Sequence, residues 1–327
     1  MSEATVSRVL NGKPGVGEAT RQAVLTALDV LGYERPTQLR GERARLVGLV
    51  LPELQNPIFP AFADVVGGAL AERELTPLLC TQAAGVQEAA YIELLLQQQV
   101  SGVIFIGGQY AEADSPHEHY ARLAERKLPT VLVNAGIDRL PFPRVSCDDA
   151  VAVEQAVGHL LSLGHRMIGL VLGPADHVPS QRKLSAARAL AQRSDFELPD
   201  ERVAHALFSL EGGQAAAAAL LSQGITGLVC ASDPIALGAV RAARRARISV
   251  PGDVSIVGYD DSAFMNCTDP PLTTVRQPIE AMGRAAVDVL VGLIGGTRGA
   301  PGELLYAPEL VVRGSTGPVA ARFLQPA

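Results

Sequence analysis

From about residue 45 onward, short apolar runs alternate with amphipathic stretches long enough to form helices. The first run, RLVGLVLP (45–52), is short and ended by a proline, which is typical of a buried strand. The stretch FPAFADVVGGALAERE follows it with helical periodicity. Because parallel strands are joined by crossovers that are usually helical, repeated strand–helix units predict a parallel sheet with helices on both faces.

The alternation runs through two series. The first continues with the strands TPLLCT, SGVIFIGG and PTVLVN, separated by the helix EAAYIELLLQQQ and a helix around 117–127. The second runs from PRVSCDD through RMIGLVLG and ITGLVCAS to VSIVGYDD, with helices around 149–165, 180–193 and 233–247. A late helix within PLTTVRQPIEAMGRAAVDVLVGLIGG and two strands in ELLYAPELVVRGS complete the pattern. We predict an α/β body of two doubly wound parallel-sheet subdomains, with a ligand cleft between the carboxyl ends of the sheets.

Composition narrows the class of protein. No apolar run approaches the roughly 18 residues that span a bilayer, and no basic start precedes an apolar stretch. The four cysteines, Cys80, Cys147, Cys230 and Cys267, match no zinc or redox spacing, so we expect reduced and mostly buried thiols. These features predict a cytoplasmic protein that does not contact membranes.

The net charge of −6 argues against non-specific binding of nucleic acid. The charge is uneven, because residues 1–45 hold seven Lys or Arg against five acidic residues. This pattern fits a mildly basic head on an acidic body. The polar stretch 34–45, ERPTQLRGERAR, lacks periodicity and predicts a hinge or linker.

The head, residues 1–33, predicts two helices separated by a turn. Ser2 is a suitable N-cap, Val6, Val9 and Leu10 form one apolar face, and Asn11-Gly12 is a helix stop. The second helix would bury the side that carries Ala23, Val24, Ala27, Leu28 and Leu31. Two readings stay open on chemistry alone. In a DNA-binding pair Arg8 would contact guanine and Thr5 and Ser7 phosphate; otherwise this is a helical hairpin with a solvated polar face.

No motif in the chain points to catalysis or to metal binding. G-x-S-x-G and H-E-x-x-H do not occur, and GVGEAT (15–20) follows no strand, so it is not a dinucleotide loop. The histidines of HEH (117–119) lack the further ligands that a metal site needs. We therefore predict neither an enzyme nor a bound metal or cofactor.

The run SEATVSRVLNGKPGV, followed by TRQAVLTALDVLGY, resembles the second half of the DNA-binding domain of the LacI/GalR family. The resemblance implies a recognition helix over Glu3–Leu10, in which Glu3 and Ala4 vary with operator sequence. It places Thr5, Ser7, Arg8 and Asn11 against DNA backbone or bases, and Leu39 as the hinge leucine that wedges into the minor groove. The family's first helix has no counterpart before Ser2 and the hinge is shorter, so we expect weak DNA binding from this partial helix-turn-helix.

The body resembles the same family in LVGLVLPELQNPIFPAF, HLLSLGHRMIGLVLGP, PELVVRGST and the long run around VGYDD and PPLTTVRQP. This implies a periplasmic-binding-protein-like fold with three chain crossings between subdomains. The expected limits are 46–318 for the body, with subdomain 1 at 46–147 plus 277–303, subdomain 2 at 148–276 plus 304–318, and a tail at 319–327.

Eight residues are expected to contact an effector in the cleft. By resemblance Arg182 is the arginine that holds the ligand, since a guanidinium can bind hydroxyls or a carboxylate; the alternative is a surface arginine. Asp260 ends a strand where ligands bind, whereas Asp261 better fits a turn cap. The other expected contacts are Asn56, Phe59, Asp149, Phe208, Ser232 and Gln277.

These features together predict a ligand-responsive transcriptional regulator, a repressor, that acts as a homodimer on a pseudo-palindromic operator. Its effector is expected to be a carbohydrate, because the head and PPLTTVR also look like maltose and α-glucoside regulators of the family. The alternative is a solute-binding protein with the same body and no DNA function, which the helical head disfavours.

Overall fold

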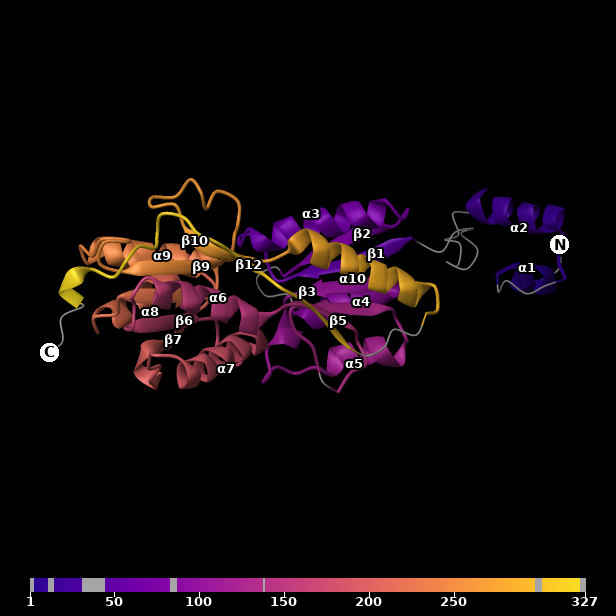
Figure 1. Ribbon diagram of the computed structural model, residues 1–327. Coiled ribbons are helices and arrows are strands. Elements are labelled where there is room, and N and C mark those ends of the chain that lie inside the picture. Colours follow the sequence, from indigo (N-terminus) through magenta and orange to yellow (C-terminus); the bar gives the residue numbers. More distant parts are fainter. Residues whose placement is uncertain are drawn as a thin grey trace.

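The computed structural model describes residues 3–10, 15–30, 45–82, 87–137, 139–297 and 302–323. Its body contains two six-stranded sheets, with strand orders β11-β5-β4-β3-β1-β2 and β12-β10-β9-β8-β6-β7. We call the first sheet with its helices the first subdomain, and the second sheet with its helices the second subdomain (Figure 1). The α/β fold predicted from the alternation of strands and helices is confirmed.

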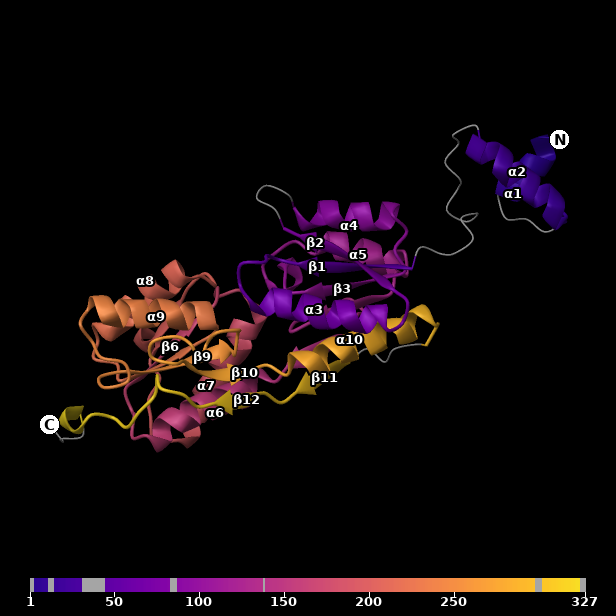
Figure 2. The ribbon, with the colours of Figure 1, turned by 90° about the horizontal axis from the view of Figure 1, so that it is seen from above.

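In the first subdomain every paired strand runs parallel to its neighbours. Helices α3 and α10 cover one face of the sheet, and α4 and α5 cover the other (Figure 2). The strands are β1 Leu46–Leu51, β2 Thr76–Thr81, β3 Gly102–Ile106, β4 Thr130–Val133, β5 Arg144–Cys147 and β11 Glu303–Tyr306; the helices are α3 Ile58–Ala71, α4 Glu88–Gln97, α5 Glu118–Glu125 and α10 Ile279–Ile294.

The second subdomain repeats this plan, with α6 and α7 on one face of its sheet and α8 and α9 on the other (Figure 2). Its strand β12 is antiparallel to β10, which the parallel prediction did not include. The strands are β6 Ile168–Leu172, β7 Val203–His205, β8 Gly227–Cys230, β9 Ser255–Asp260, β10 Thr273–Arg276 and β12 Glu309–Val311; the helices are α6 Asp149–Ser162, α7 Val178–Arg193, α8 Leu210–Leu221 and α9 Asp233–Arg245.

In the described part of the chain, three connections join the subdomains: β5 to α6, β10 to α10, and β11 to β12. The boundary expected at 303/304 lies inside β11, so that limit was wrong. All of β11 pairs with β5 in the first sheet, and the chain crosses only at 307–308. The two strands predicted in ELLYAPELVVRGS are present, but each one closes a different sheet.

Helices on both faces bury the central strands completely. Every residue of β3, β4, β6 and β8 is buried, which explains why these strands are continuous apolar runs rather than alternating ones. Cys80, Cys147 and Cys230 are buried as expected, whereas Cys267 is exposed. None of the helices within the described ranges is long and apolar enough to cross a bilayer.

The head contains α1 Glu3–Leu10 and α2 Glu18–Val30, as predicted. Val9 and Val24 are buried against each other, with Val6 and Val16 packed around them. Ala23 and Ala27 were expected on the buried side of α2 but are exposed, because the contact between these two helices is narrow. Residues 31–44, which include Leu39 and nearly all of the expected hinge, lie outside the described residues, and so does Asn11.

Helices α8 and α9 approach each other closely at two glycines. A Cβ on Gly238 would lie 2.6 Å from the backbone nitrogen of Gln214, and a Cβ on Gly213 would lie 2.6 Å from the Cα of Ile235. A methyl group at either position meets backbone rather than a movable side chain. The second subdomain therefore depends on glycine at this helix contact.

We predict that Gly238→Ala lowers the free energy of unfolding by about 1–3 kcal/mol, because the two helices must separate. Gly68→Ala is the matched control, since Gly68 is an exposed position on α3 with open space around its Cβ position. The control should raise stability by about 0.5–1 kcal/mol through helix propensity. Urea unfolding followed by circular dichroism measures both, and equal effects would contradict the close contact.

Candidate functional site

A cavity of about 500 Å³ lies between the two subdomains. Its volume is within the ~300–1,000 Å³ of typical small-molecule sites. Both subdomains supply its walls, so a ligand inside would contact both. The wall combines aromatic, amide and carboxyl side chains: Glu53, Asn56, Phe59, Phe62, Gln82, Gln109, Glu112, Asn134, Asp149, His177, Lys183, Phe208, Ser232, Tyr259, Asp260 and Gln277.

The position of the cavity follows from the direction of the strands. Parallel strands end at one edge of a sheet, and ligands of doubly wound folds bind outside that edge. Asn134 follows β4 in the first subdomain, while Ser232 and Asp260 lie at the ends of β8 and β9 in the second. Gln277 follows β10, at one of the connections between the subdomains. The cleft predicted between the carboxyl ends of the sheets is therefore present.

Seven of the eight residues expected to contact an effector line this cavity. Their contact with a ligand remains a prediction, but the fold brings them together from elements far apart in the sequence. They are Asn56, Phe59, Asp149, Phe208, Ser232, Asp260 and Gln277.

A hydrogen-bonded chain connects the two subdomains across the wall of the cavity. Gln277 Nε2 donates to Asp260 Oδ1 at 2.7 Å, and Asn134 Nδ2 donates to Gln277 Oε1 at 3.1 Å. Asn134 Oδ1 in turn accepts from the backbone nitrogen of Cys147 at 3.0 Å. Asp260, Gln277 and Asn134 belong respectively to the second subdomain, a crossing and the first subdomain. A ligand that binds Asp260 would therefore touch a group linked directly to the crossing.

Asp260 is held in an unusual state. Its φ of +116° is rarely adopted by an L-residue, and such strain is concentrated at functional sites. Burial raises the pKa of Asp260 well above its usual range, and the nearby Asp233 raises it further. Burial also raises the pKa of Asp233, to about 6. A protonated Asp260 can both donate and accept hydrogen bonds, which suits recognition of a hydroxyl group.

Lys183 supplies the positive charge of the cavity wall. Its Nζ forms a buried ion pair with Asp149 and lies 4.1 Å from the centroid of the Tyr259 ring. Burial raises the pKa of Asp149, and Lys183 opposes that shift. The ammonium group is therefore paired and stacked even without a ligand.

Arg182 does not line the cavity, contrary to the expectation that it holds the ligand. Its guanidinium binds both carboxylate oxygens of Glu303 on β11, at 2.7 and 3.1 Å. Ser146 Oγ also donates to Glu303 at 2.6 Å. Burial alone would raise the pKa of Glu303, but the hydrogen bonds from Arg182 and Ser146 lower it. Since α7 and β11 belong to different subdomains, Arg182 ties the two together, and its neighbour Lys183 occupies the cavity instead.

Aromatic side chains form the apolar part of the wall. Phe59 and Phe62 come from α3, Phe208 from the loop before α8, and Tyr259 from β9. Glycines make room for two of them. A Cβ on Gly173 would lie 2.7 Å from Phe208 Cε2, and one on Gly107 would lie 3.1 Å from Phe59 Cε1. Flat apolar faces beside hydroxyl-binding groups are suited to a ring with one apolar and one polar side.

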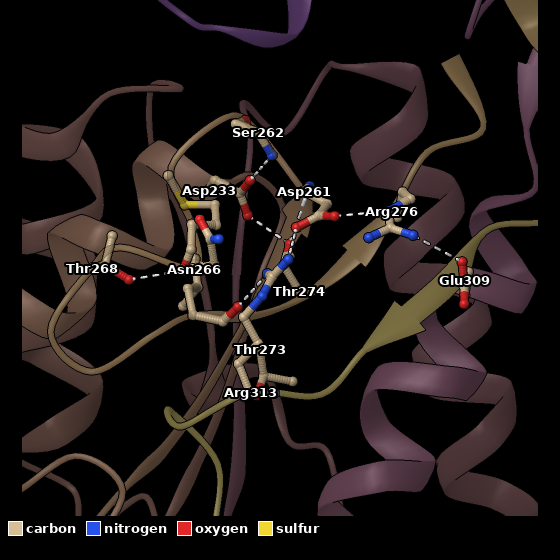
Figure 3. A network of polar contacts seen from close by, with 12 residues as sticks. Asp233, Asp261, Ser262, Asn266, Thr268, Thr273, Thr274, Arg276, Glu309 and Arg313 are labelled. Carbon is tan, nitrogen blue, oxygen red and sulfur yellow. Dashed lines mark hydrogen bonds and ion pairs between the residues drawn. The ribbon is translucent and has the colours of Figure 1, made fainter. Parts of the chain in front are cut away.

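Behind the cavity, Asp261 binds two arginines (Figure 3). Arg276 Nε donates to its Oδ2 at 2.7 Å, and an Nη of Arg313 donates to its Oδ1 at 2.6 Å. Arg276 also pairs with Glu309 on β12 at 3.2 Å. Asp261 was expected to cap a turn; in fact it fastens the end of β9 to β10 and to the segment after β12. Two of the three crossings, the one after β10 and the one before β12, therefore meet the second subdomain close to Asp261.

At another side of the cavity the loops of the two subdomains meet through their backbones. Glu112 and His177 form an isolated antiparallel bridge, and the nitrogen of Ala113 donates to the oxygen of Asp176 at 2.8 Å. Burial and, to a smaller extent, the charge of Lys183 lower the pKa of His177 to about 4, so this ring is neutral near pH 7. This contact closes the cavity in the arrangement described.

Several polar wall residues were missed from the sequence, and five of them carry charged, imidazole or amide groups from outside the predicted set: Glu53, Gln82, Glu112, His177 and Lys183. Four of them lie outside the helices and strands or at a strand's end, where no periodicity marks the inward side. Lys183 did have a signal. It lies three residues after Ser180 and four before Ala187, and these three form the buried stripe of α7.

In the head, the residues expected to contact DNA lie on α1. Ser7 and Arg8 are exposed, whereas Thr5 is half-buried and lies four residues before Val9, on the same side of the helix as the contact between Val9 and Val24. The side chains of Glu3 and Ala4 lie outside the described part, as do Asn11 and Leu39. An exposed polar side on a short helix is compatible with insertion into a major groove.

Comparisons with known proteins agree with this architecture. Residues 1–36 match the family model for bacterial regulatory proteins of the lacI family, and residues 157–316 match the model for a periplasmic-binding-protein-like domain. The chain is 53% identical over 324 residues to the HTH-type transcriptional regulator reg1 of Streptomyces lividans, covering 97% of this chain and 93% of that one. It is 52% identical over 321 residues to the HTH-type transcriptional regulator MalR of Streptomyces coelicolor, with the same coverage.

Solved structures show the same likeness. The transcriptional regulator CelR in complex with cellobiose superimposes with a TM-score of 0.76 at 32% identity, over 96% of each chain. The lac repressor dimer bound to operator and the anti-inducer ONPF superimposes with a TM-score of 0.74 at 27% identity, over 97% of this chain and 96% of that one. With a helix-turn-helix head joined to a two-subdomain body around a ligand-sized cavity, the chain belongs to the LacI family and is a ligand-responsive, DNA-binding transcriptional regulator.

Proposed function

We propose that this regulator is a repressor whose cavity binds a small saccharide, and that the saccharide changes its affinity for operator DNA. One observation carries the proposal: a cavity of about 500 Å³ between the subdomains combines carboxyl, amide and aromatic groups. Carboxyl and amide oxygens accept hydrogen bonds from hydroxyl groups, and aromatic rings pack against the C–H face of a sugar. The CelR structure, described as a cellobiose complex, supports this ligand class.

The mechanism requires an effector to distinguish two arrangements of the subdomains. A saccharide that contacts Asp260 on one side and Asn56 or Phe59 on the other stabilises the arrangement in which both sets of contacts exist. The crossings beside Gln277 and Asp261 transmit the change in angle. The relation between the two heads of a homodimer then changes, and with it their fit to a pseudo-palindromic operator. The lac repressor structure contains such a dimer on operator.

Such a protein regulates rather than catalyses, and it acts where chromosomal DNA is found, in the bacterial cytoplasm. The same body could serve a solute-binding protein, but the head that matches the lacI family model over residues 1–36 favours a regulator.

We predict that at least one mono- or disaccharide raises the melting temperature of the protein in differential scanning fluorimetry. Asp260→Ala should abolish the shift, because it removes the hydrogen-bonding carboxyl at the centre of the wall. Asp64→Ala, an exposed aspartate on α3, is the matched control and should keep the full shift. A panel of mono- and disaccharides without any response would refute the saccharide effector.

For the head, we predict that Arg8→Ala lowers affinity for an operator selected from random-sequence DNA more than it lowers affinity for unrelated DNA. A base-contacting arginine contributes about 1–3 kcal/mol of discrimination. Arg21→Ala on the exposed side of α2 removes the same charge and should lower the affinity for both DNAs by the same factor. Fluorescence anisotropy at fixed salt measures the ratio, and an unchanged ratio for Arg8→Ala would show that Arg8 contacts only phosphate.

The tie between the subdomains also has a measurable consequence. Arg182→Glu should weaken binding of the stabilising saccharide roughly three- to tenfold, because this half-buried pair holds the subdomains in the arrangement described. The reversed pair, Arg182→Glu with Glu303→Arg, should recover most of the affinity in isothermal titration calorimetry. Arg188→Glu, which breaks an exposed pair with Asp200 inside the second subdomain, should change nothing. Equal losses in the single and reversed variants would rule out the tie.

A further inference from the structure

We propose that the effector is an uncharged, unphosphorylated saccharide, and that the charges of the cavity exclude sugar phosphates and other anionic sugars. This inference rests on the proposed saccharide effector and narrows its chemical class. The inference depends on the charged groups that line the cavity in the described part of the chain.

The lining contains little positive charge. Lys183 is the single lysine or arginine among the described lining residues. Its ammonium group already has the carboxylate of Asp149 as a buried partner and the Tyr259 ring at 4.1 Å. If Lys183 bound a ligand phosphate instead, Asp149, itself about as buried, would lose its ion-pair partner.

His177 does not add a cation. It lines the cavity, its Nδ1 lies 3.3 Å from Ser180 Oγ, and its ring meets the edge of Phe208 with centroids 5.1 Å apart. The burial that lowers its pKa to about 4 keeps the ring neutral at physiological pH. Arg182, the neighbour of Lys183 in the sequence, is not among the lining residues, and its guanidinium is bound to Glu303.

Four of the described lining residues carry carboxyl groups: Glu53, Glu112, Asp149 and Asp260. One of these, Asp149, is already paired with Lys183. Burial raises the pKa of Glu53, and it raises the pKa of Asp260 well above its usual range, so burial disfavours the charged form of both carboxyl groups. Glu112 is half-buried, and its carboxylate accepts a hydrogen bond from Ser115 Oγ at 2.5 Å. A phosphate in this space would face carboxyl groups with no unpaired cation opposite.

The same groups suit neutral hydroxyls. Carboxyl oxygens of the lining can accept hydrogen bonds from hydroxyl groups, and Asn56, Gln82, Gln109 and Ser232 add donors and acceptors without charge. A neutral disaccharide can therefore satisfy the wall, whereas its phosphate would lose the hydration of a dianion without compensation. Glu112 is the residue best placed to discriminate, because it stands at the backbone bridge that closes the cavity.

Isothermal titration calorimetry on the full chain tests the inference with cellobiose and maltose against their 6′-phosphates. We expect at least one neutral sugar to bind, and its phosphate to bind at least about a hundredfold more weakly. Glu112→Gln keeps the size of the side chain and an acceptor for Ser115, and should narrow that gap roughly tenfold. Glu118→Gln, on the exposed face of α5 and outside the cavity lining, is the matched control and should leave the gap unchanged.

The outcomes separate the two proposals. A phosphorylated sugar that binds as tightly as its neutral form overturns the exclusion of anions but leaves a saccharide effector in place. Failure of all neutral and phosphorylated sugars overturns the saccharide effector, and this inference with it. A gap that persists unchanged in Glu112→Gln, with wild-type affinity for the neutral sugar, shows that Glu112 does not discriminate.

Discussion

Two parallel sheets that face each other with their carboxyl ends set the main constraint on this molecule. The polar residues that follow the strands therefore line the cavity between the subdomains, where they must form hydrogen bonds with each other, with a ligand or with water. The chain Asp260–Gln277–Asn134 meets that demand within the protein, at 2.7 and 3.1 Å. Because Gln277 lies on a crossing, a change in how Asp260 is hydrogen-bonded would act directly on a connection between the subdomains. In the proposed mechanism, recognition and conformational change would therefore depend on the same few side chains.

The crossings are reinforced from outside the cavity as well. Asp261, next to Asp260, holds Arg276 and Arg313, while Arg182 reaches from α7 to Glu303 on β11. The pairs of Asp261 lie within the second subdomain, whereas the two-oxygen contact of Arg182 with Glu303 joins the subdomains. Together with the backbone contacts of residues 112–113 and 176–177, the Arg182–Glu303 pair holds the subdomains in the described arrangement. An effector can select between discrete states, whereas a continuously deformable joint would give it nothing to select.

The elements and the cleft were predictable because buried strands and covering helices have distinct apolar periods, and because strand ends define where ligands bind. Asp260, Ser232 and Gln277 could be placed in this way. The resemblance assigned the ligand contact to Arg182, whereas Lys183 lines the cavity, because neighbours on a helix point about 100° apart. The buried stripe of α7 at Ser180, Lys183 and Ala187 would have decided between the two. Loop residues such as Glu112 and His177 carry no periodic signal, and their inward position depends on contacts between distant segments.

Arg182 and Lys183 are adjacent on α7 but form different contacts, and this difference limits which ligands the cavity suits. The planar guanidinium of Arg182 binds both oxygens of Glu303 at once, which suits a fixed tie between subdomains. The ammonium of Lys183 is compact enough to fit between Asp149 and the Tyr259 ring. With its cation already paired, the cavity would recognise the proposed saccharide through hydrogen bonds and ring contacts rather than through charge. Those contacts need both subdomain walls at the right separation, so a neutral ligand of this kind would favour the arrangement in which the walls lie close together.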